Sequence, residues 1–396
     1  MTAIHDGMMR WAALALATAL AGCAVDDSGP VRSVWRPESG KPSYVNVVYV
    51  TDRVADAKAA GGFNTRWADK ASCGTAQAIV PAALLPGEKP QYGYVAKTTP
   101  SECSDGKFAL AGAIALIEAQ AKAKNCRSVF LFVHGFHTGF DGAVLRAAQV
   151  SHDAQTGCAV AAFSWSAEID VDRYVSDLEH SDYSQPLLAE FLRELAESGL
   201  RVTILGHSLG SRLMLMTLSG LSHGREKVRQ GFIDELVLAA ADVGTDPSNN
   251  DFDHLMRDAA SYAKRTTIYV SSLDSVLEIS RREHGGVPRL GNQTDLAFRP
   301  DDTNHIVDVI DTSESRADRL DHSYYAMSPE TVADMTLALS GVPAEDRLTA
   351  KTGSPPTLIC GKDAPCAPKL KVPEGREPRF VTRLIIRLLP LVPLVR

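Results

Sequence analysis

The 396-residue chain has no basic block in its body and no internal repeat. Its 41 basic and 48 acidic residues give a net charge of −7, so a nucleic-acid-binding function is not expected. The apolar run near its start, residues 11–20, is too short to cross a bilayer as a helix. The sequence also offers no cofactor motif. What is present is an ordinary globular composition, 45% hydrophobic and 22% charged, with enough apolar residues for a sizeable core.

The N-terminus has the pattern of an export signal. Arg10 precedes the apolar run, which ends in Leu20-Ala21-Gly22-Cys23. This ending resembles the bacterial lipoprotein signature, in which the cysteine thiol is acylated. We therefore expect a signal peptide over residues 1–22 and lipidation of Cys23. The mature protein would be anchored in the bacterial cell envelope and face the periplasm, and the absence of Asp directly after Cys23 favours the outer membrane. The alternative is a plainly secreted protein with an incidental cysteine.

Composition divides the rest of the chain into three parts. Residues 23–44 contain Asp, Ser, Gly and Pro and predict a tether, residues 45–341 predict a folded domain, and residues 342–396 form a tail rich in Pro, Lys and Gly. The tail ends in an apolar stretch in which Arg379, Arg383 and Arg387 share one helix face. This segment either contacts an anionic membrane surface or packs on its own domain.

Short apolar strands alternate with helices in the predicted domain. After a strand at Val45–Val50, residues 54–90 are Ala-, Gly- and Pro-rich and predict irregular structure. Apolar strands are then expected at Ser128–Val133, Cys158–Phe163, Arg201–Leu205, Ile233–Ala240, Thr266–Val270 and His305–Ile310, with helices between the earlier ones, the last at Pro186–Glu197 and Ser211–Leu221. Such strands indicate an α/β fold with a mainly parallel twisted sheet covered by helices on both faces.

A candidate nucleophile lies between one of these strands and the next helix. Gly206-His207-Ser208-Leu209-Gly210 is a G-x-S-x-G motif in its required context of strand, tight turn and helix. The turn presents the serine hydroxyl above the sheet, and the flanking glycines let strand and helix pack closely. The helix N-terminus favours developing negative charge. We therefore expect Ser208 to be the nucleophile and His207 to be structural.

The strand at Ser128–Val133 leads into His134-Gly135-Phe136, an arrangement that supplies backbone donors to an oxyanion hole. The amides of Phe136 and Leu209 are the expected donors. His134 and His137 have an H-x-x-H spacing without a third ligand nearby, so no metal site is predicted there.

A serine nucleophile needs a base and an acid, in the order serine, acid, histidine. Asp274 follows the strand at Thr266–Val270 and is the preferred acid, while Asp242, one strand earlier, remains the alternative. His322, beyond the last strand, is the preferred base over His284 and His305.

Taken together, these motifs resemble an uncharacterised bacterial family of α/β hydrolases in the esterase/lipase superfamily. The resemblance spans roughly residues 45–340. It rests on Val48–Arg53, Tyr92–Tyr94, His134–Phe136, Phe163–Trp165, Gly206–Gly210, Ala240–Val243, Ser271–Asp274, Arg289–Gly291 and His322–Tyr324. It implies the α/β-hydrolase fold and a Ser-Asp-His site, but no particular substrate.

Six cysteines remain after Cys23, an even number that favours disulfides in an oxidising compartment. In the sheet that the resemblance implies, Cys126 and Cys158 open neighbouring parallel strands, which implies a Cys126–Cys158 bond. The remaining expected pairs are Cys73–Cys103 and Cys360–Cys366.

The function predicted from these features is hydrolysis of a small carboxylic ester, or of a related acyl bond, by a serine hydrolase. The alternative is a non-catalytic binding or scaffold protein that uses the hydrolase fold in the envelope.

Overall fold

The computed structural model describes residues 31–347, apart from 35–39, 84–87, 90, 104–109, 157, 171, 246–250, 295–305, 316–317, 319 and 345. The predicted signal peptide, Cys23 and the tail with Cys360 and Cys366 lie outside the described residues. His305, one of the alternative bases, also lies outside them. Within the described part, no helix combines the length and the apolar character that crossing a membrane requires.

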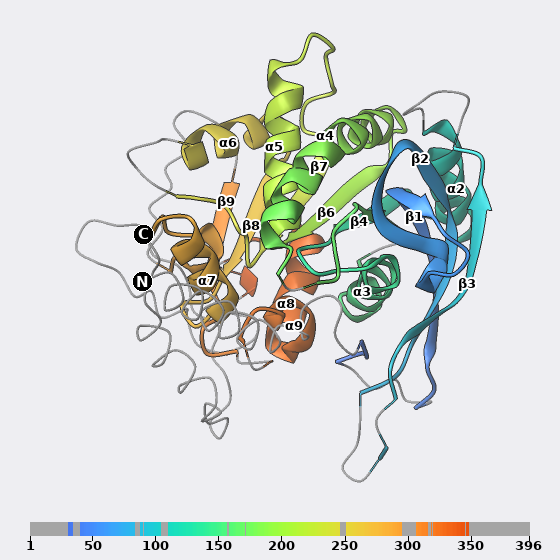
Figure 1. The fold of residues 1–396 in the computed structure, drawn as a ribbon, viewed down its shortest axis with the longest axis horizontal. Helices are drawn as coiled ribbons and strands as arrows, with labels where there is room; N and C mark the ends of the chain where they lie inside the picture. Colours follow the sequence, from blue (N-terminus) through green and yellow to red (C-terminus); the bar gives the residue numbers. More distant parts are fainter. Residues whose placement is uncertain are drawn as a thin grey trace, which may run out of the picture.

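One sheet organises the domain, in the strand order β3-β2-β1-β5-β4-β6-β7-β8-β9 (Figure 1). Strand β2 is antiparallel to both of its neighbours, and all other neighbouring pairs are parallel. The strands are β1 Ser43–Ala55, β2 Phe63–Val80, β3 Tyr94–Ser101, β4 Ser128–Val133, β5 Ala159–Ser164, β6 Arg201–His207, β7 Ile233–Ala239, β8 Arg265–Val270 and β9 Ile306–Asp311.

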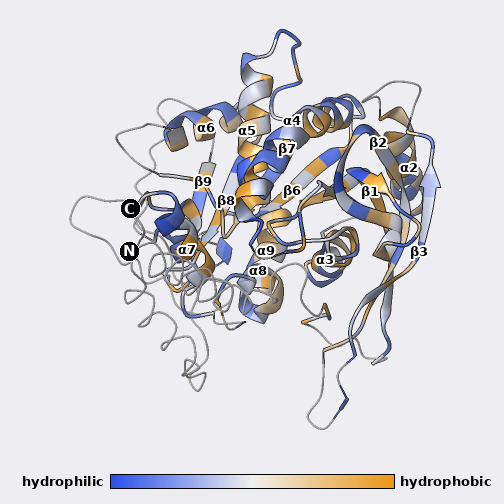
Figure 2. Ribbon diagram, viewed as in Figure 1, coloured by the Kyte–Doolittle hydropathy of each residue, from blue (hydrophilic) through white to orange (hydrophobic). Residues whose placement is uncertain are grey.

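Helices cover both faces of this sheet, because successive strand residues point to opposite sides. In β4, Val129 and Leu131 join one core with helices α2, α4, α5 and α6, whereas Phe130 and Phe132 join a second core with α3, α8 and α9. Figure 2 shows hydrophobic and hydrophilic residues on different sides of these helices. The predicted mainly parallel sheet between two helical layers is confirmed. The helices are α2 Ala111–Ala123, α3 Phe140–Asp153, α4 Tyr174–Glu197, α5 Leu209–His223, α6 Asp251–Ala260, α7 Ser275–Glu283, α8 Tyr324–Met327 and α9 Pro329–Leu339.

The prediction of irregular structure over residues 54–90 was wrong. Residues 63–80 form the long strand β2, which pairs with β1. Its small residues are the reason, because Gly74 pairs with Tyr49 and an added Cβ at Gly74 would lie 2.7 Å from the Tyr49 hydroxyl. Glycine and alanine in this segment therefore leave room for the larger side chains of β1.

The packed domain also extends beyond the predicted limits of residues 45 and 341. Before β1, Val31 and Ser33 are buried, and the Ser33 hydroxyl donates a 2.5 Å hydrogen bond to Asp153. Beyond α9, Arg347 is fully buried, 3.7 Å from Asp334. Short segments on both sides of residues 45–341 therefore pack against the domain.

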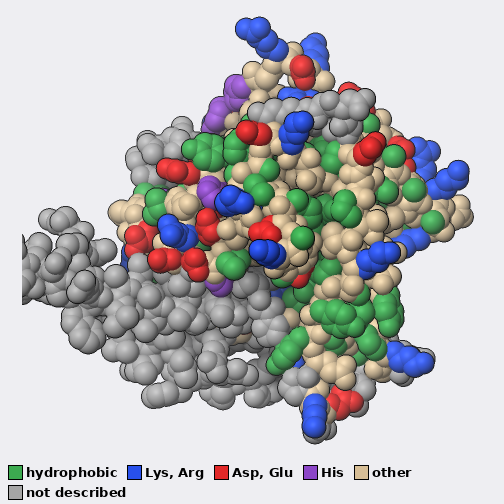
Figure 3. Space-filling view, turned by 45° about the vertical axis from the view of Figure 1, so that its right-hand side comes forward, with side chains coloured by type: hydrophobic (Ala, Val, Ile, Leu, Met, Phe, Trp, Pro, Cys, Tyr) green, Lys and Arg blue, Asp and Glu red, His purple; other side chains and the backbone are tan. Residues whose placement is uncertain are grey.

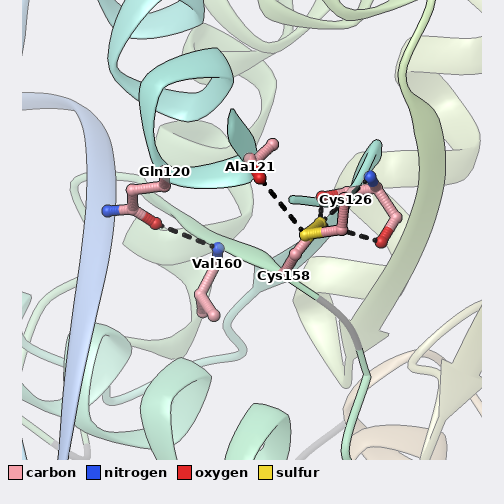
Figure 4. Close-up of a disulfide and its surroundings, with 6 residues drawn as sticks. Gln120, Ala121, Cys126, Cys158 and Val160 are labelled. Carbon is pink, nitrogen blue, oxygen red and sulfur yellow. Dashed lines mark hydrogen bonds between the residues drawn. A yellow bond between two sulfur atoms is a disulfide. The ribbon is translucent and has the colours of Figure 1, made fainter. Parts of the chain in front are cut away.

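The described residues contain two disulfides, and both are pairs predicted from the sequence. Cys73–Cys103 has a Cα–Cα distance of 5.5 Å and Cys126–Cys158 one of 6.0 Å. Figure 4 shows the Cys126–Cys158 bond; Cys126 lies two residues before β4 and Cys158 directly before β5. Val129 of β4 pairs with Ala159 of β5, which brings the two cysteines together. The predicted Cys360–Cys366 pair lies outside the described residues.

Candidate active site

Ser208 occupies the sharp turn between β6 and α5. Its φ of 52° and ψ of −121° are unfavourable for a residue with a side chain, and such strain is concentrated at functional sites. The turn is held from both sides, because Ser208 N–H donates to the Ala239 carbonyl at 3.0 Å and Asp242 N–H donates to the Ser208 carbonyl at 3.2 Å. The sequence-predicted elbow thus stands at the C-terminal edge of the sheet.

Two glycines make room for this elbow. A Cβ on Gly210 would lie 2.3 Å from the carbonyl oxygen of His134, so only glycine lets α5 approach the end of β4. A Cβ on Gly135 would lie 2.9 Å from Cβ of Ser208. Gly135 therefore leaves open the space directly beside the candidate nucleophile.

The structure brings the preferred acid and base together. His322, in the loop after β9, has its Nδ1 2.8 Å from Oδ2 of Asp274, in the loop after β8. Both side chains are buried. The other Asp274 oxygen accepts the N–H of Leu277 at 3.0 Å and so caps α7. Burial raises the pKa of Asp274, although the neighbouring His322 counteracts part of that rise.

Two further residues position the His322 loop. The Nε2 of His207 donates to the His322 carbonyl at 3.2 Å, so the residue before Ser208 contacts the loop that carries the candidate base. The Asp318 carboxylate accepts the N–H groups of His322 at 3.2 Å and of Ser323 at 2.6 Å. The sequence predicted a structural role for His207, and the hydrogen bond to the His322 loop is consistent with that role. Asp318 was missed, although an aspartate four residues before a candidate base is a recognisable loop-capping signal.

The predicted oxyanion donors flank this site. Phe136 follows Gly135 at the end of β4, and Leu209 is the first residue of α5. Within the described part of the chain, the backbone N–H groups of Phe136 and Leu209 have no hydrogen-bond acceptor. Buried N–H groups normally find one, so these two amides are available to a ligand beside Ser208.

Asp242, the alternative acid, has different partners. Its Oδ1 accepts hydrogen bonds from Arg289 at 2.7 Å and from Ser280 at 2.6 Å, and its Oδ2 accepts one from the Tyr174 hydroxyl at 2.6 Å. Burial alone would raise the pKa of Asp242, but Arg289 and the hydroxyl donors outweigh it and the pKa is lowered. Asp242 therefore serves as the buried counterion of Arg289.

The residues that bond Asp242 also contact the oxyanion loop and His284, the alternative base. The ring of Tyr174 packs edge-on against Phe136 at 5.5 Å, so the Asp242 network borders the oxyanion loop. His284, an alternative base, has its Nδ1 2.8 Å from the Ser280 carbonyl and belongs to this network. Tyr174 and Ser280 had no signal in the sequence, whereas Arg289 lies in a motif that carried the family resemblance.

His134, half of the H-x-x-H spacing, is buried in the core. Its ring stacks on Trp165 at 5.1 Å, and the Trp165 Nε1 donates to the His134 carbonyl at 2.7 Å. The ring of His137 packs against Phe136 at 5.8 Å. Both histidines thus support the loop that carries the oxyanion donors.

Comparison with known families agrees with this geometry. Residues 112–340, more than half of the chain, match a family described as "Alpha/beta hydrolase of unknown function (DUF900)". The chain belongs to this family. The mostly parallel sheet with helices on both faces is thus that of an α/β hydrolase.

Solved structures similar to this α/β hydrolase are distant from it. The dienelactone hydrolase from Anabaena variabilis is 10% identical with a TM-score of 0.33, and the match covers 76% of this chain and 99% of that one. The protein TT1662 from Thermus thermophilus is 13% identical with a TM-score of 0.31, over 54% of this chain and 88% of that one. Comparison with curated proteins finds no match. The family assignment therefore rests on the match over residues 112–340 and not on these solved structures.

Proposed function

We propose that this α/β hydrolase cleaves carboxylic esters, or related acyl bonds, through Ser208, His322 and Asp274. The observation that carries the proposal is the convergence of the elbow at Ser208 with the buried His322–Asp274 pair, whose loop is bonded to His207. Three strand ends thereby contribute a nucleophile, a base and an acid, which is the composition of a serine-hydrolase site.

The chemistry follows from these positions. The Ser208 hydroxyl attacks the substrate carbonyl carbon while its proton moves to Nε2 of His322, and Asp274 stabilises the imidazolium through Nδ1. The oxyanion accepts hydrogen bonds from the amides of Phe136 and Leu209. As the tetrahedral intermediate collapses, the leaving alkoxide takes the proton from His322. Water, deprotonated by His322, then releases the acid from Ser208.

The location of this activity is a separate proposal. Acylation at Cys23 would anchor the protein in the bacterial envelope with the catalytic domain in the periplasm, favouring the outer membrane, and the apolar C-terminal segment could add a membrane contact. The disulfides Cys73–Cys103 and Cys126–Cys158 support an oxidising compartment, because such bonds are rare in the cytosol.

A fluorophosphonate probe tests the proposed function. We expect it to label the folded, disulfide-intact protein and to label the Ser208→Ala variant no more than background. A panel of acyl esters of increasing chain length would then define the substrate. If the wild-type protein is folded and is not labelled, the catalytic proposal is wrong and a binding or scaffold role on the hydrolase fold takes its place.

A further inference from the structure

A cluster of two histidines and an aspartate lies away from the candidate active site, between α5 and α6. His223 is the last residue of α5, and His254 and Asp258 are separated by one helical turn on α6. One potential ligand atom from each of the three lies within 4.8 Å of the others. This is the one such group in the described part of the chain. The proposed function of the protein does not use it.

The distances are close to those of a metal site. Oδ2 of Asp258 lies 3.4 Å from Nε2 of His254. Its distance of 3.7 Å to His223 is measured to Nδ1, the nitrogen bonded to Ser219, so the His223 ring must turn to bring Nε2 toward Asp258. In a tetrahedral zinc site with bonds of 2.0–2.1 Å, ligand atoms lie about 3.3 Å apart. The side chains of His223 and His254 are 60% and 54% exposed, so they can rotate to close the remaining gap. Figure 3 shows histidine side chains exposed on the molecular surface.

Hydrogen bonds around the cluster orient its ligands. Nδ1 of His223 lies 2.9 Å from the Ser219 carbonyl, which fixes that nitrogen as the donor and leaves Nε2 of the ring to bind an ion. The Ser219 hydroxyl donates to Oδ2 of Asp258 at 2.6 Å. One residue of α5 thus orients a ligand on its own helix and a ligand on α6, as residues that support metal ligands commonly do.

The charges also suit a cation. The side chain of Asp258 is only 12% exposed, and among the described residues its ion-pair partners are His223 and His254. Among those residues it therefore has no lysine or arginine partner that a metal would have to displace. Two imidazoles and one carboxylate favour Zn²⁺ among the common divalent metals.

We propose that His223, His254 and Asp258 bind one zinc ion that joins the end of α5 to α6. Water would occupy the fourth coordination position of the zinc ion, and the ion would hold the two helices together. Helix α6 lies between β7 and β8 in the chain, so the ion would fasten this helix to α5.

Zinc binding to the full-length, disulfide-intact protein without a polyhistidine tag tests the proposal. Calorimetric titration with ZnCl₂ should give one ion per chain at micromolar or tighter affinity, and zinc should raise the thermal midpoint by several degrees because it binds the folded state. Both effects should vanish in His254→Ala and in Asp258→Asn. Ser219→Ala should weaken zinc binding by roughly 10-fold, because it removes a supporting hydrogen bond but no ligand.

His152→Ala is the matched control, because His152 also pairs with an aspartate, Asp153, but has no second histidine beside it in the described part of the chain. It should bind zinc as the wild type does. Cobalt provides a second readout, since Co²⁺ should give the visible absorption of a tetrahedral site in the wild type and not in His254→Ala. Binding only at millimolar zinc, or equal binding by wild type and Asp258→Asn, means an adventitious ion only and overturns the proposal.

Discussion

Oδ2 of Asp274 lies 2.8 Å from Nδ1 of His322, and this buried contact joins the loop after β8 to the loop after β9. Another buried aspartate at this end of the sheet, Asp242, is bonded to Arg289. The two acids thus differ in their partners. Asp274 can orient an imidazole, whereas Asp242 neutralises a guanidinium. Substitutions at the two positions should therefore affect different properties.

Replacing Asp274 by Asn should abolish most activity while the fold is retained. The asparagine side chain could still fill the site, but its amide would favour the wrong tautomer of His322 and could not stabilise the imidazolium. We expect kcat for an activated ester to fall on the order of 10³–10⁴-fold. Steady-state kinetics measure this fall, with circular dichroism as the check on folding. Retention of more than a tenth of the activity would contradict the assignment of Asp274 as the acid.

Replacing Asp242 by Asn should mainly reduce stability. It leaves the buried Arg289 guanidinium without its counterion, which typically costs about 3–5 kcal/mol. Denaturant unfolding measures this loss, and protein that remains folded should keep far more activity than Asp274→Asn does.

The matched control for Asp242→Asn is Asp182→Asn. Asp182 also pairs with an arginine, Arg212, at 2.8 Å, but its side chain is 48% exposed, so its loss should cost less than about 1 kcal/mol. If Asp242→Asn destabilises the protein no more than Asp182→Asn, the buried ion pair does not have the role assigned to it. If only Asp242→Asn removes activity, Asp242 and not Asp274 is the acid.

Local sequence predicted those parts of the fold in which apolar residues are also the buried residues. The apolar run Ser128–Val133 became β4 with the same bounds, because a short run of apolar residues has no stable place except inside the sheet. Helix α4 was predicted to start at Pro186, but it begins at Tyr174. Its first half is polar, and of its residues only Asp177, Ser181 and Ser184 are buried. Tertiary bonds such as that from the Glu168 N–H to Asp177 hold it, and a local pattern does not show them.

The candidate site divides in the same way. Ser208 could be predicted because the elbow needs its glycines within two residues, and Asp274 and His322 could be predicted because strand order fixes where they meet. The partners of Asp242 could not be predicted. Tyr174 and Ser280 are 68 and 38 residues away from Asp242 in the chain, and neither belongs to a motif. They meet Asp242 only because α4 and α7 converge at one edge of the sheet.

Replacing Gly135 by Ala should lower activity strongly at small cost to the fold. The added Cβ would lie 2.9 Å from Cβ of Ser208, so either the nucleophile or the loop with Phe136 must move. A displacement of this order can cost about 10²-fold in kcat. Labelling rate with the fluorophosphonate probe and ester kinetics measure it.

Gly220→Ala is the control for Gly135→Ala. Gly220 lies inside α5, and an added Cβ there meets nothing within 4 Å. It should leave activity unchanged and raise helix stability by up to about 1 kcal/mol. Normal labelling of Gly135→Ala would show that the space beside Ser208 is not needed.

Removing the Cys126–Cys158 bond should destabilise the domain without changing its active site. The bond closes a loop with a sequence separation of 32 residues, for which loss of the cross-link costs about 3–4 kcal/mol. The double variant Cys126→Ser/Cys158→Ser should therefore unfold at lower denaturant concentration and, while folded, keep the kcat of the wild type. Reduction of the wild-type protein should have at least the same effect, because it also breaks Cys73–Cys103. Equal unfolding midpoints for the double variant and the wild type would contradict this prediction.

Stability should depend on pH through Glu235, a buried residue of β7. Burial raises its pKa from 4.5 to about 8, although the hydrogen bond from Thr267 and the nearby Arg347 and Arg265 favour the charged form. Between these two values the folded state holds a proton that the unfolded chain has released. The stabilisation is therefore complete below about pH 4.5 and is lost as the pH rises through about 8.

The variant Glu235→Gln tests this dependence, because Gln has the same shape, accepts the same Thr267 hydrogen bond and does not ionise. The free energy of unfolding of Glu235→Gln should thus fall by a few kcal/mol less than that of the wild type between about pH 5 and 9. Denaturant unfolding across this range measures both curves, and parallel curves would show that Glu235 has an ordinary pKa.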